Sequence, residues 1–478
     1  MSNDRLSPIK MALSDVNLFS DHLVHIPLLS YQRPVADGIC KMVMSGNGGI
    51  ITVEMPRQSG KNQISATCEV FLLLAHYMKG GCIVKTAPTY QPQLAISKNR
   101  LISILDRCEL TKKRWKTQDG NSIALGRARE VFLSAQPGAN VVGATADIAL
   151  FVDEAQEIDI EKFERDFSPM RAWKNSPTIV FGVRWDGNSF FERLIETNLE
   201  YEEIHGERRH YRVEPEFVTE VNPSYKRHFD QEVARLGKDH ILIKTQYLLE
   251  SVSALGDLFS PAQIQSMRGD FKRTQKPVSG YRYFMGIDIG GEQTGLENHD
   301  ETILTVAQKS NRKDDEILIV NCYRWKGASW EKLHREISLL LDSWRPSGVV
   351  VDGRGIGNAT SMWIREHYKY GGVEVYQATS STVTEDGYIL MSMAELGKIK
   401  IFSDDGKVSS DGLVSAEEIF SQLGNAKREL GQSGQMKFYV PEKYGHDDIL
   451  KSVAYAVRAS RNSDKRYENI LLEAVTVD

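Results

Sequence analysis

The first half of the chain alternates short apolar runs with stretches in which apolar residues recur at helical spacing. The apolar runs are residues 49–53, 82–86, 149–152 and 177–182. A run that is apolar throughout is typical of a strand buried on both faces, as in a parallel sheet covered by helices. The pattern therefore predicts an α/β fold with a parallel sheet for residues 1–255.

The second half begins with three strand-like runs joined by short connections, which is typical of an antiparallel meander. A helical pattern, a strand, a second helical pattern and a further strand follow. The strand-like runs are residues 281–289, 302–307, 316–323, 348–352 and 373–376, and the clearest helical pattern is 330–341. This order of elements resembles that of the ribonuclease H-like fold, which we expect for residues 281–478.

A polar segment separates the two patterns. Residues 267–273 are mostly charged or polar, and Pro277, Ser279 and Gly280 follow them. Because Gly and Pro interrupt helices and strands, we predict a linker at residues 256–280 between two domains. The length of 478 residues also favours two domains. Single hydrophobic cores stop growing at roughly 250–300 residues.

Composition argues against several classes of protein. The longest apolar stretches are too short to span a membrane, and the first residues do not read as a secretion signal. The five cysteines are scattered without close pairs, which argues against a zinc site or a disulfide framework and favours a reducing compartment. The net charge of −5 implies that any contact with DNA is local. The basic runs 112–114 and 208–210 are candidates, although each is also typical of an ordinary solvated surface.

Residues 55–62 lie between an apolar run and a helical pattern and read Met-Pro-Arg-Gln-Ser-Gly-Lys-Asn. A strand, a loop ending in Gly-Lys and a helix form a phosphate-binding loop, in which backbone N–H groups and the helix dipole attract phosphate. The candidate nucleotide-binding residues of this loop are Arg57, Gln58, Ser59, Gly60, Lys61 and Asn62. Two positions depart from the usual motif: Met55 replaces its first glycine, and Asn62 replaces the Ser or Thr that would bind Mg²⁺.

The apolar run 149–152 ends in two acids, Asp153 and Glu154. Ligands of parallel sheets gather beyond the carboxyl ends of the strands. We therefore expect Asp153 to lie near Lys61 and to hold Mg²⁺ on a nucleotide, directly or through water. Glu154 would be the general base that orients the attacking water. Together with Gly60 and Lys61, these acids predict an ATPase.

Carboxylates also stand at the ends of elements in the second half. Asp288 ends the first strand there, Asp352 ends the fourth, and Asp447 and Asp448 open the last helix. The first and fourth strands are neighbours in the expected fold, so these acids can converge and bind Mg²⁺ or Mn²⁺. Two such ions can stabilise the attacking and leaving oxygens of a phosphodiester. We predict a nuclease in which all four acids are metal ligands and Asp288, Asp352 and Asp447 are catalytic.

The apolar face of the last helix distinguishes its two acids. Ile449, Leu450 and Val453 share that face when each residue turns the helix by about 100°. On this projection Asp447 borders the apolar face, whereas Asp448 points nearly opposite. We therefore expect Asp447 to be the stronger metal ligand, with Asp448 as an N-terminal cap or as the ligand of a second ion.

Taken together, these residues resemble the large terminase subunit of tailed bacteriophages over nearly the whole chain. The motifs concerned are Tyr31-Gln32, Arg57-Gln58-Ser59-Gly60-Lys61, Ala87-Pro88-Thr89-Tyr90, Val152-Asp153-Glu154-Ala155, Asp288, Asp352 and His446-Asp447-Asp448. The resemblance implies an ASCE-type P-loop ATPase in which Tyr31 and Gln32 bind adenine, followed by a ribonuclease H-like nuclease. It implies an ATP-driven motor that translocates double-stranded DNA into a procapsid and cuts concatemeric DNA with Mg²⁺, for which Mn²⁺ could substitute.

The resemblance also implies partners and a place of action. These are a portal protein ring and a small terminase subunit in the host cytoplasm, with a free monomer that forms a pentameric ring when docked. The family often has an arginine before the glycine that precedes the second ATPase motif, where this chain has Val142. Arg57, Arg127 or Arg129 could supply that charge instead. We favour Arg57, because the loop motif fixes it beside the phosphates.

Two other readings compete with a packaging motor. One is a cellular helicase–nuclease of DNA repair or recombination. The terminase-like sequence of the phosphate-binding loop argues against it. The other is a docking subunit with degenerate sites, which Met55 and Asn62 favour. Glu154 and the complete set of acids argue against that second reading.

Overall fold

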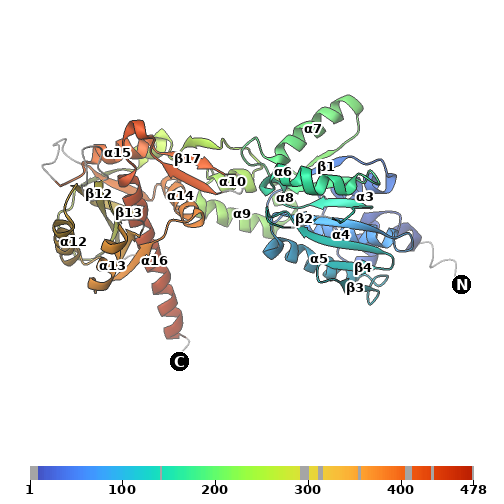
Figure 1. The fold of residues 1–478 in the computed structure, drawn as a ribbon, viewed down its shortest axis with the longest axis horizontal. Coiled ribbons are helices and arrows are strands. Elements are labelled where there is room, and N and C mark those ends of the chain that lie inside the picture. Colours follow the sequence, from blue (N-terminus) through green and yellow to red (C-terminus); the bar gives the residue numbers. More distant parts are fainter. Residues whose placement is uncertain are drawn as a thin grey trace. The chain divides into compact units, whose positions relative to one another are not determined.

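The computed structural model describes residues 9–139, 141, 143–290, 301–310, 316–353, 357–403, 412–431 and 435–475. These residues fall into two compact units, each built on a sheet of its own (Figure 1). Unit 1 comprises the described residues of Met1–Ala234 and Ile241–Ser253. Unit 2 comprises those of Arg235–His240, Ala254–Gly431 and Gln435–Asp478.

Unit 1 is built on an eight-stranded sheet. In spatial order its strands are β3 (Trp115–Gln118), β4 (Ser122–Leu125), β5 (Ala128–Ser134), β2 (Gly81–Ala87), β6 (Ala149–Val152), β7 (Thr178–Gly182), β1 (Ile50–Glu54) and β8 (His210–Arg212). The six strands from β5 to β8 in that order are mutually parallel, and β3 and β4 extend the sheet in antiparallel fashion. Strand β7 lies between β1 and β6, as in an ASCE-type P-loop domain. The predicted parallel α/β fold is confirmed.

Helices cover both faces of this sheet. The helices in this part of the chain are α2 (Val16–Phe19), α3 (Arg33–Ser45), α4 (Lys61–Ala75), α5 (Ala95–Arg107), α6 (Ile160–Lys162), α7 (Phe190–His205), α8 (Pro215–Val221), α9 (Pro223–Leu236) and α10 (Ile241–Gln246). Val84 and Leu150 pack with Phe191 of α7 on one face. Lys85, the next residue of β2, reaches Glu69 of α4 on the other face. Successive side chains of a strand point to opposite faces, so one strand contributes to both layers.

Unit 2 is built on a seven-stranded sheet. In spatial order its strands are β10 (Arg268–Lys272), β16 (Ile399–Ser403), β13 (Ile317–Lys326), β12 (Glu301–Ser310), β11 (Tyr281–Asp288), β14 (Gly348–Asp352) and β15 (Gly372–Tyr376). Strands β11, β12 and β13 form the antiparallel meander, and β14 runs parallel to both β11 and β15. The predicted ribonuclease H-like order, with the first and fourth strands adjacent, is confirmed. A smaller sheet has the order β18 (Met436–Tyr439), β17 (Lys427–Leu430) and β9 (Leu255–Asp257).

Helices also lie on both faces of the larger sheet of unit 2 (Figure 1). The helices of this unit are α11 (Pro261–Ser266), α12 (Trp330–Trp344), α13 (Gly357–His367), α14 (Ser380–Glu395), α15 (Ala416–Asn425) and α16 (Asp448–Val475). Ile287 of β11 packs with Ile337 of α12. The preceding Gly286 faces α16, where a Cβ would lie 2.8 Å from the backbone carbon of Tyr455. Asp288 follows Gly286 by two residues and therefore shares the α16 face.

Residues 256–280, which we predicted to be a linker, are part of unit 2 instead. Strand β9 pairs with β17, and β10 pairs with β16. Strand β10 is polar because it is an edge strand whose residues alternate between exposed and half-buried positions. Its composition marks the rim of a sheet and not a break between domains. The main division of the chain falls between Ser253 and Ala254.

Candidate active sites

The loop between β1 and α4 has the backbone of a phosphate-binding loop. Gly60 adopts φ +100° immediately before α4, and a Cβ there would collide with the side chain of Gln32. The backbone N–H of Arg57 donates to the carbonyl of Gln246 at 2.7 Å, which fixes the outer part of the loop. Met55 is fully buried. The residue that replaces the usual glycine is therefore a core residue of the loop's base.

Lys61 and Glu154 form the central contact of this site. The Nζ of Lys61 lies 3.1 Å from Oε1 of Glu154, and this buried nitrogen makes no hydrogen bond of good geometry with any described residue. Glu154 follows β6 in the left-handed region, at φ +50°. Burial favours a higher pKa for Glu154, but the nearby charge of Lys61 and a hydrogen bond from Gln156 outweigh it and lower that pKa. Glu154 is therefore an ionised carboxylate at neutral pH.

Gln156 is a contact that our sequence analysis missed. Its Nε2 donates to Oε2 of Glu154 at 2.8 Å, and its Oε1 accepts from the backbone N–H of Val183 at 3.2 Å. The buried amide thus connects Glu154 to the residue that follows β7. The only signal in the sequence is a glutamine two residues after Glu154, which by itself indicates no partner.

Asp153 does not pair with Lys61, although both residues line the same end of the sheet. Its Oδ2 accepts a hydrogen bond from Ser97 at 2.9 Å and lies 3.2 Å from Nζ of Lys85. Its Oδ1 is buried and, in the part of the chain that the structure describes, has no hydrogen-bond partner. Our sequence analysis missed Ser97 and Lys85, although a lysine within an apolar strand is a signal that a buried counter-charge must exist.

Tyr31 and Gln32 reach the phosphate-binding loop itself. Tyr31 is 3% exposed, and its hydroxyl donates to the carbonyl of Ser59 at 3.0 Å. The Nε2 of Gln32 donates to the same carbonyl at 3.2 Å. The ring of Tyr31 packs edge-on against Phe217, with 6.0 Å between centroids. Both side chains therefore hold the loop in place, and their contact with adenine stays a prediction.

The candidate arginines lie at different ends of the sheet. Arg57 is exposed, and its charge is one of those that lower the pKa of Glu154. Arg127 and Arg129 lie at the start of β5, where Arg129 is in register with Cys82 near the start of β2. That edge is opposite to the one at which the phosphate-binding loop lies. Val142 lies outside the described residues.

The acids of unit 2 meet on one face of its sheet. Asp288 and Asp352 end the adjacent parallel strands β11 and β14, in which Ile287 is in register with Val351. Gly348 of β14 faces α16, since a Cβ there would lie 3.1 Å from the carbonyl of Ala459. The period of two along a strand places Asp352 on this face as well. The structure therefore brings both strand-end acids to the face that α16 covers.

Asp448, and not Asp447, points toward these strands. Asp448 is 8% exposed, and its Oδ2 accepts from the backbone N–H of Glu301 on β12 at 3.2 Å. Asp447 pairs with Lys451 at 2.6 Å, and its side chain is 22% exposed. The predicted orientation of the two acids is therefore wrong. Asp447 precedes the first residue of α16, so the angular step of the helix does not extend to it.

Charge in this acidic site is unbalanced. Burial raises the pKa of Asp288 well above its ordinary range; Lys451 opposes this, and the carboxylates of Asp448, Asp352 and Asp447 add to it. Within the described residues, no three His, Cys, Asp or Glu side chains are arranged closely enough to hold a metal ion. The donors nevertheless suit one, because hard carboxylate oxygens and surplus negative charge are what Mg²⁺ and Mn²⁺ require.

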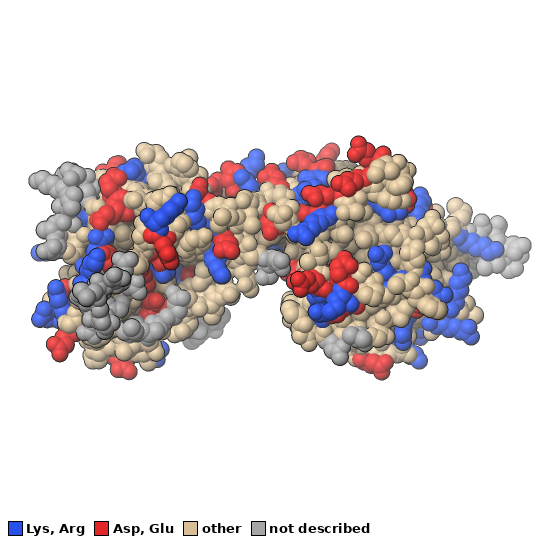
Figure 2. Space-filling view, turned by 45° about the horizontal axis from the view of Figure 1, so that its top comes forward, with Lys and Arg blue, Asp and Glu red and all other residues tan. Residues whose placement is uncertain are grey.

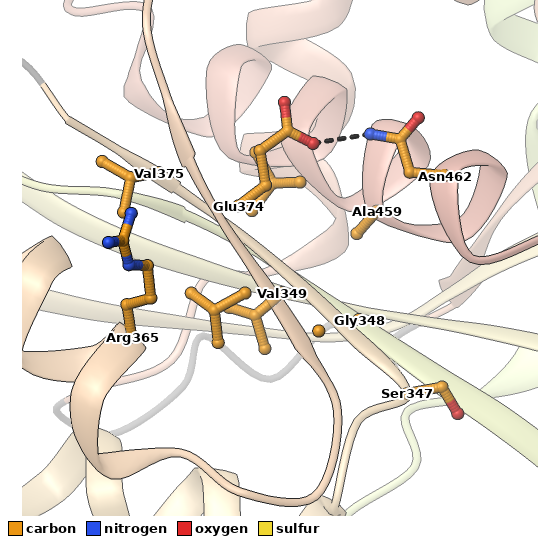
Figure 3. Close-up of a pocket in the computed structure, with 11 residues that line it drawn as sticks. Ser347, Gly348, Val349, Arg365, Glu374, Val375, Ala459 and Asn462 are labelled. Atoms are coloured by element: carbon orange, nitrogen blue, oxygen red, sulfur yellow. Dashed lines mark hydrogen bonds between the residues drawn. The ribbon is translucent and has the colours of Figure 1, made fainter. Parts of the chain in front are cut away.

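The cavity shown in Figure 3 is separate from the acids. It has a volume of about 460 Å³ and is lined by residues of β14, β15, α13 and α16. Within it, Glu374 accepts a hydrogen bond from Asn462 at 2.5 Å. Gly348, which opens β14, lines the cavity, whereas Asp352 ends that strand. The residues that line the cavity include none of the four acids Asp288, Asp352, Asp447 and Asp448.

Acidic and basic side chains are intermingled on the face shown in Figure 2. The basic run 208–210 is engaged in contacts within unit 1: Arg208 stacks on Tyr211 and Arg209 on Tyr201, at 4.5 and 3.4 Å from the ring centroids. His210 is buried, 3.3 Å from Glu54. Among the described helices, none combines the length and apolarity needed to cross a bilayer.

The two units define a class of protein: one chain that joins an ASCE-type P-loop domain to a ribonuclease H-like domain. Solved structures of the large terminase of a thermophilic bacteriophage are similar to this chain over almost its whole length. Crystal form 2 of that terminase gives a TM-score of 0.56 at 13% identity and covers 90% of this chain and 98% of that chain. Its complexes with ATP-gamma-S and with ADP in crystal form 3 give TM-scores of 0.54 and 0.55 at 14% identity. They cover 91% and 90% of this chain and 99% and 98% of those chains.

This chain therefore has the fold of bacteriophage large terminases, and the resemblance seen in its sequence motifs is confirmed at the level of the fold. No protein-family model matches the sequence, and a search of curated proteins finds no match. A fold shared at such low identity does not by itself establish an activity. The activity must be argued from the sites.

Proposed function

We propose that this protein is the large subunit of a phage DNA-packaging terminase. Unit 1 would hydrolyse ATP to translocate double-stranded DNA into a procapsid, and unit 2 would cut concatemeric DNA. The observation that carries the proposal is the pairing of Lys61 with Glu154 directly beside Asp153. A phosphate-binding lysine, a base and a metal-binding carboxylate then stand at one end of one sheet. The thermophilic bacteriophage terminase that shares this fold has been solved with ATP-gamma-S and with ADP.

The residues of unit 1 suit a magnesium nucleotide. Within the residues that the structure describes, the buried nitrogen of Lys61 makes no well-formed hydrogen bond, and one buried carboxylate oxygen of Asp153 has no partner. Lys61 would bind the outer phosphates, and Asp153 would hold Mg²⁺, which neutralises charge on the phosphates when bound. Glu154 would orient and deprotonate the attacking water. Arg57, Gln58, Ser59, Gly60 and Asn62 would line the phosphates, with Arg57 as the candidate finger toward a neighbouring subunit.

The residues of unit 2 suit a metal-dependent nuclease. Asp288, Asp352 and Asp448 would hold Mg²⁺ or Mn²⁺, which stabilises negative charge on the phosphodiester when bound. Asp447 would act from the edge of the site, where it already positions Lys451. We extend the proposal to the partners that a packaging terminase needs: double-stranded DNA, a portal ring and a small terminase subunit. A pentameric ring on the procapsid in the host cytoplasm completes it.

Cleavage of plasmid DNA by the purified full chain tests this proposal first. We expect cutting in the presence of Mg²⁺ or Mn²⁺, none in EDTA, and none with Asp352→Asn. ATP hydrolysis by the same preparation should be lost in Lys61→Ala while that variant still cuts DNA. Cutting that persists in Asp352→Asn, or hydrolysis that persists in Lys61→Ala, would overturn the assignment of the corresponding site.

A further inference from the structure

The two oxygens of the Asp153 carboxylate have different surroundings. Oδ2 accepts a hydrogen bond from the hydroxyl of Ser97 at 2.9 Å and lies 3.2 Å from the ammonium of Lys85. Oδ1 is buried and has no hydrogen-bond partner among the described residues. A carboxylate held through one oxygen cannot rotate freely about its last bond, so the direction of the other oxygen is fixed.

Lys85 is anchored from the neighbouring helix. It is 1% exposed, and its Nζ lies 2.7 Å from both Oε1 of Glu69 and Oγ of Ser65. Burial favours a lower pKa for Lys85, but the carboxylates of Asp153 and Glu69 outweigh it and raise that pKa, so the lysine stays charged. Glu69 lies two turns after Lys61 on α4. The helix that begins at the phosphate-binding loop therefore also fixes the cation beside Asp153.

Ser97 stands where a hydroxyl is otherwise missing. In a usual P-loop the residue after the lysine carries a hydroxyl beside the metal, whereas this chain has Asn62 there. Asp153 makes no hydrogen bond with Asn62 within the described residues, and its hydroxyl donor is Ser97. Ser97 lies in the first turn of α5 and is buried. Ser97, on a separate helix, thus gives Asp153 a hydroxyl hydrogen bond that Asn62 does not provide.

We propose that Ser97 is a positioning residue of the nucleotide site, which directs Oδ1 of Asp153 toward the magnesium ion of the bound nucleotide. This inference rests on the proposed ATPase function of unit 1. Groups that hydrogen-bond to a metal-binding carboxylate set its direction, and their loss typically weakens metal binding or activity about 10- to 100-fold. Ser97 itself needs no contact with the metal or the nucleotide for this role.

The effect of Mg²⁺ on nucleotide affinity tests the proposal without any turnover. The Kd of a non-hydrolysable ATP analogue is measured by calorimetry with the full-length protein, once in EDTA and once at saturating Mg²⁺. The ratio of the two Kd values reports coupling between metal and nucleotide, and the same ratio in Asp352→Asn controls for metal bound by the acids of unit 2. We expect Ser97→Ala to reduce this ratio roughly tenfold and to leave the Kd in EDTA unchanged.

Two further variants separate positioning from packing. Ser97→Thr keeps the hydroxyl and should keep the ratio of the wild type. Ser20→Ala removes a fully buried hydroxyl, which bonds to the carbonyl of Ile26 and not to Asp153, and should also keep it. Thermal unfolding of each variant verifies that it is folded. The proposal would be overturned if Ser97→Ala folds and has the wild-type ratio of Kd values. It would also be overturned if this ratio falls as far in Ser97→Thr as in Ser97→Ala.

Asp153→Asn distinguishes this inference from the function on which it rests. If Asp153→Asn loses the magnesium effect and Ser97→Ala does not, only the role of Ser97 is wrong. If Asp153→Asn behaves as the wild type, the assignment of Asp153 as metal ligand fails, and the inference about Ser97 fails with it. Loss of the magnesium effect in both variants, with recovery in Ser97→Thr, supports both.

Discussion

Lys61 and Glu154 are joined by an ion pair of 3.1 Å that links the first residue of α4 to the residue after Asp153. In the proposed function each of them has another partner, because Lys61 binds phosphate and Glu154 orients water. A nucleotide must therefore compete with Glu154 for the lysine. While that pair is intact, the charge of Lys61 also lowers the basicity of Glu154.

This competition predicts opposite effects of Glu154→Gln on binding and on turnover. ATP hydrolysis should fall by roughly 100-fold or more, because a neutral amide cannot act as a general base. ATP should bind at least as tightly as to the wild type, because Lys61 is released from its ion pair. Steady-state hydrolysis and calorimetric titration with ATP measure the two quantities. Weaker ATP binding in Glu154→Gln would contradict the proposed competition, and Lys61→Ala serves as the control that loses both binding and turnover.

Replacement of Gln156 should slow the chemical step of ATP hydrolysis without weakening ATP binding. Gln156 holds Oε2 of Glu154 at 2.8 Å and, within the described residues, makes no hydrogen bond to the phosphate-binding loop. A hydrogen bond to a charged group contributes about 1.5–3 kcal/mol, so Gln156→Leu should lower kcat roughly 10- to 100-fold with little change in KM. In the Glu154→Gln background the same substitution should cause no further loss, because the two side chains act together. Equal losses in both backgrounds would show that Gln156 acts independently of Glu154.

The parts of the site that depend on local sequence were predictable. An apolar run followed by Gly60 and Lys61 specifies a strand, a loop and a helix over a few residues. A run ending in Asp153 and Glu154 specifies the edge of the sheet at which both acids lie. The order of strands in unit 2 likewise followed from short segments whose periodicity is independent of the rest of the chain.

The contacts that assemble the site from distant segments were not predictable in the same way. Ser97 reaches Asp153 from a helix 56 residues earlier in the sequence, and nothing local distinguishes it from other serines. The predicted orientation of Asp448 was wrong because it depends on where α16 begins. The ends of helices are uncertain by one or two residues. Lys85 is an intermediate case, since its charge within an apolar strand indicated that a partner exists but not which one.

Asp448 should contribute more to metal-dependent cleavage than Asp447, which is the opposite of the order expected from the helical projection. Asp448 is buried beside β12, whereas Asp447 is held by Lys451 at the rim. We expect Asp448→Asn to reduce metal-dependent cleavage of plasmid DNA at least about tenfold more than Asp447→Asn does, because it removes a direct donor. Rates at several Mn²⁺ concentrations would separate weaker metal binding from a slower reaction. Equal rates for the two variants would contradict the assignment.

Gly286 predicts a dependence of stability on close packing of α16. A Cβ at this position would meet backbone atoms of Ser452, Tyr455 and Ala456, which cannot move without shifting the helix. Gly286→Ala should therefore reduce the free energy of unfolding by about 3 kcal/mol or more, because overpacking against backbone has no flexible side chain to absorb it. Denaturant unfolding measures this loss, and cleavage should fall as α16 and Asp448 shift.

Gly424→Ala is the matched control in the same unit. Gly424 lies within α15, and a Cβ there meets no atom within 4 Å. Gly424 is the second-to-last residue of α15, where alanine is still the better helix former but the benefit is smaller than in a helix interior. This variant should therefore be at least as stable as the wild type. If Gly286→Ala were as stable as the wild type, the close approach of α16 to β11 would be wrong.

Asp288 predicts how the stability of the metal-free protein depends on pH. Its pKa in the folded protein is raised by burial, and the nearby carboxylates add to the shift. Below about pH 4 the carboxyl is protonated in both folded and unfolded states, so its raised pKa does not reduce the free energy of unfolding there. As the pH rises, the unfolded chain releases this proton before the folded protein does, so the free energy of unfolding falls until the folded pKa is passed.

Asp288→Asn should remove that loss, because an amide does not titrate. In EDTA we expect the variant to melt at a higher Tm than the wild type at pH 8, with the difference shrinking toward zero near pH 4. Addition of Mg²⁺ or Mn²⁺ should raise the Tm of the wild type and leave that of the variant nearly unchanged, because the buried carboxylate that needs a counter-charge is gone. Thermal unfolding monitored by circular dichroism across this range provides the measurement. A variant that is less stable than the wild type at pH 8 in EDTA would show that Asp288 is already compensated within the protein, most directly by Lys451, and that the acidic site does not depend on a bound cation.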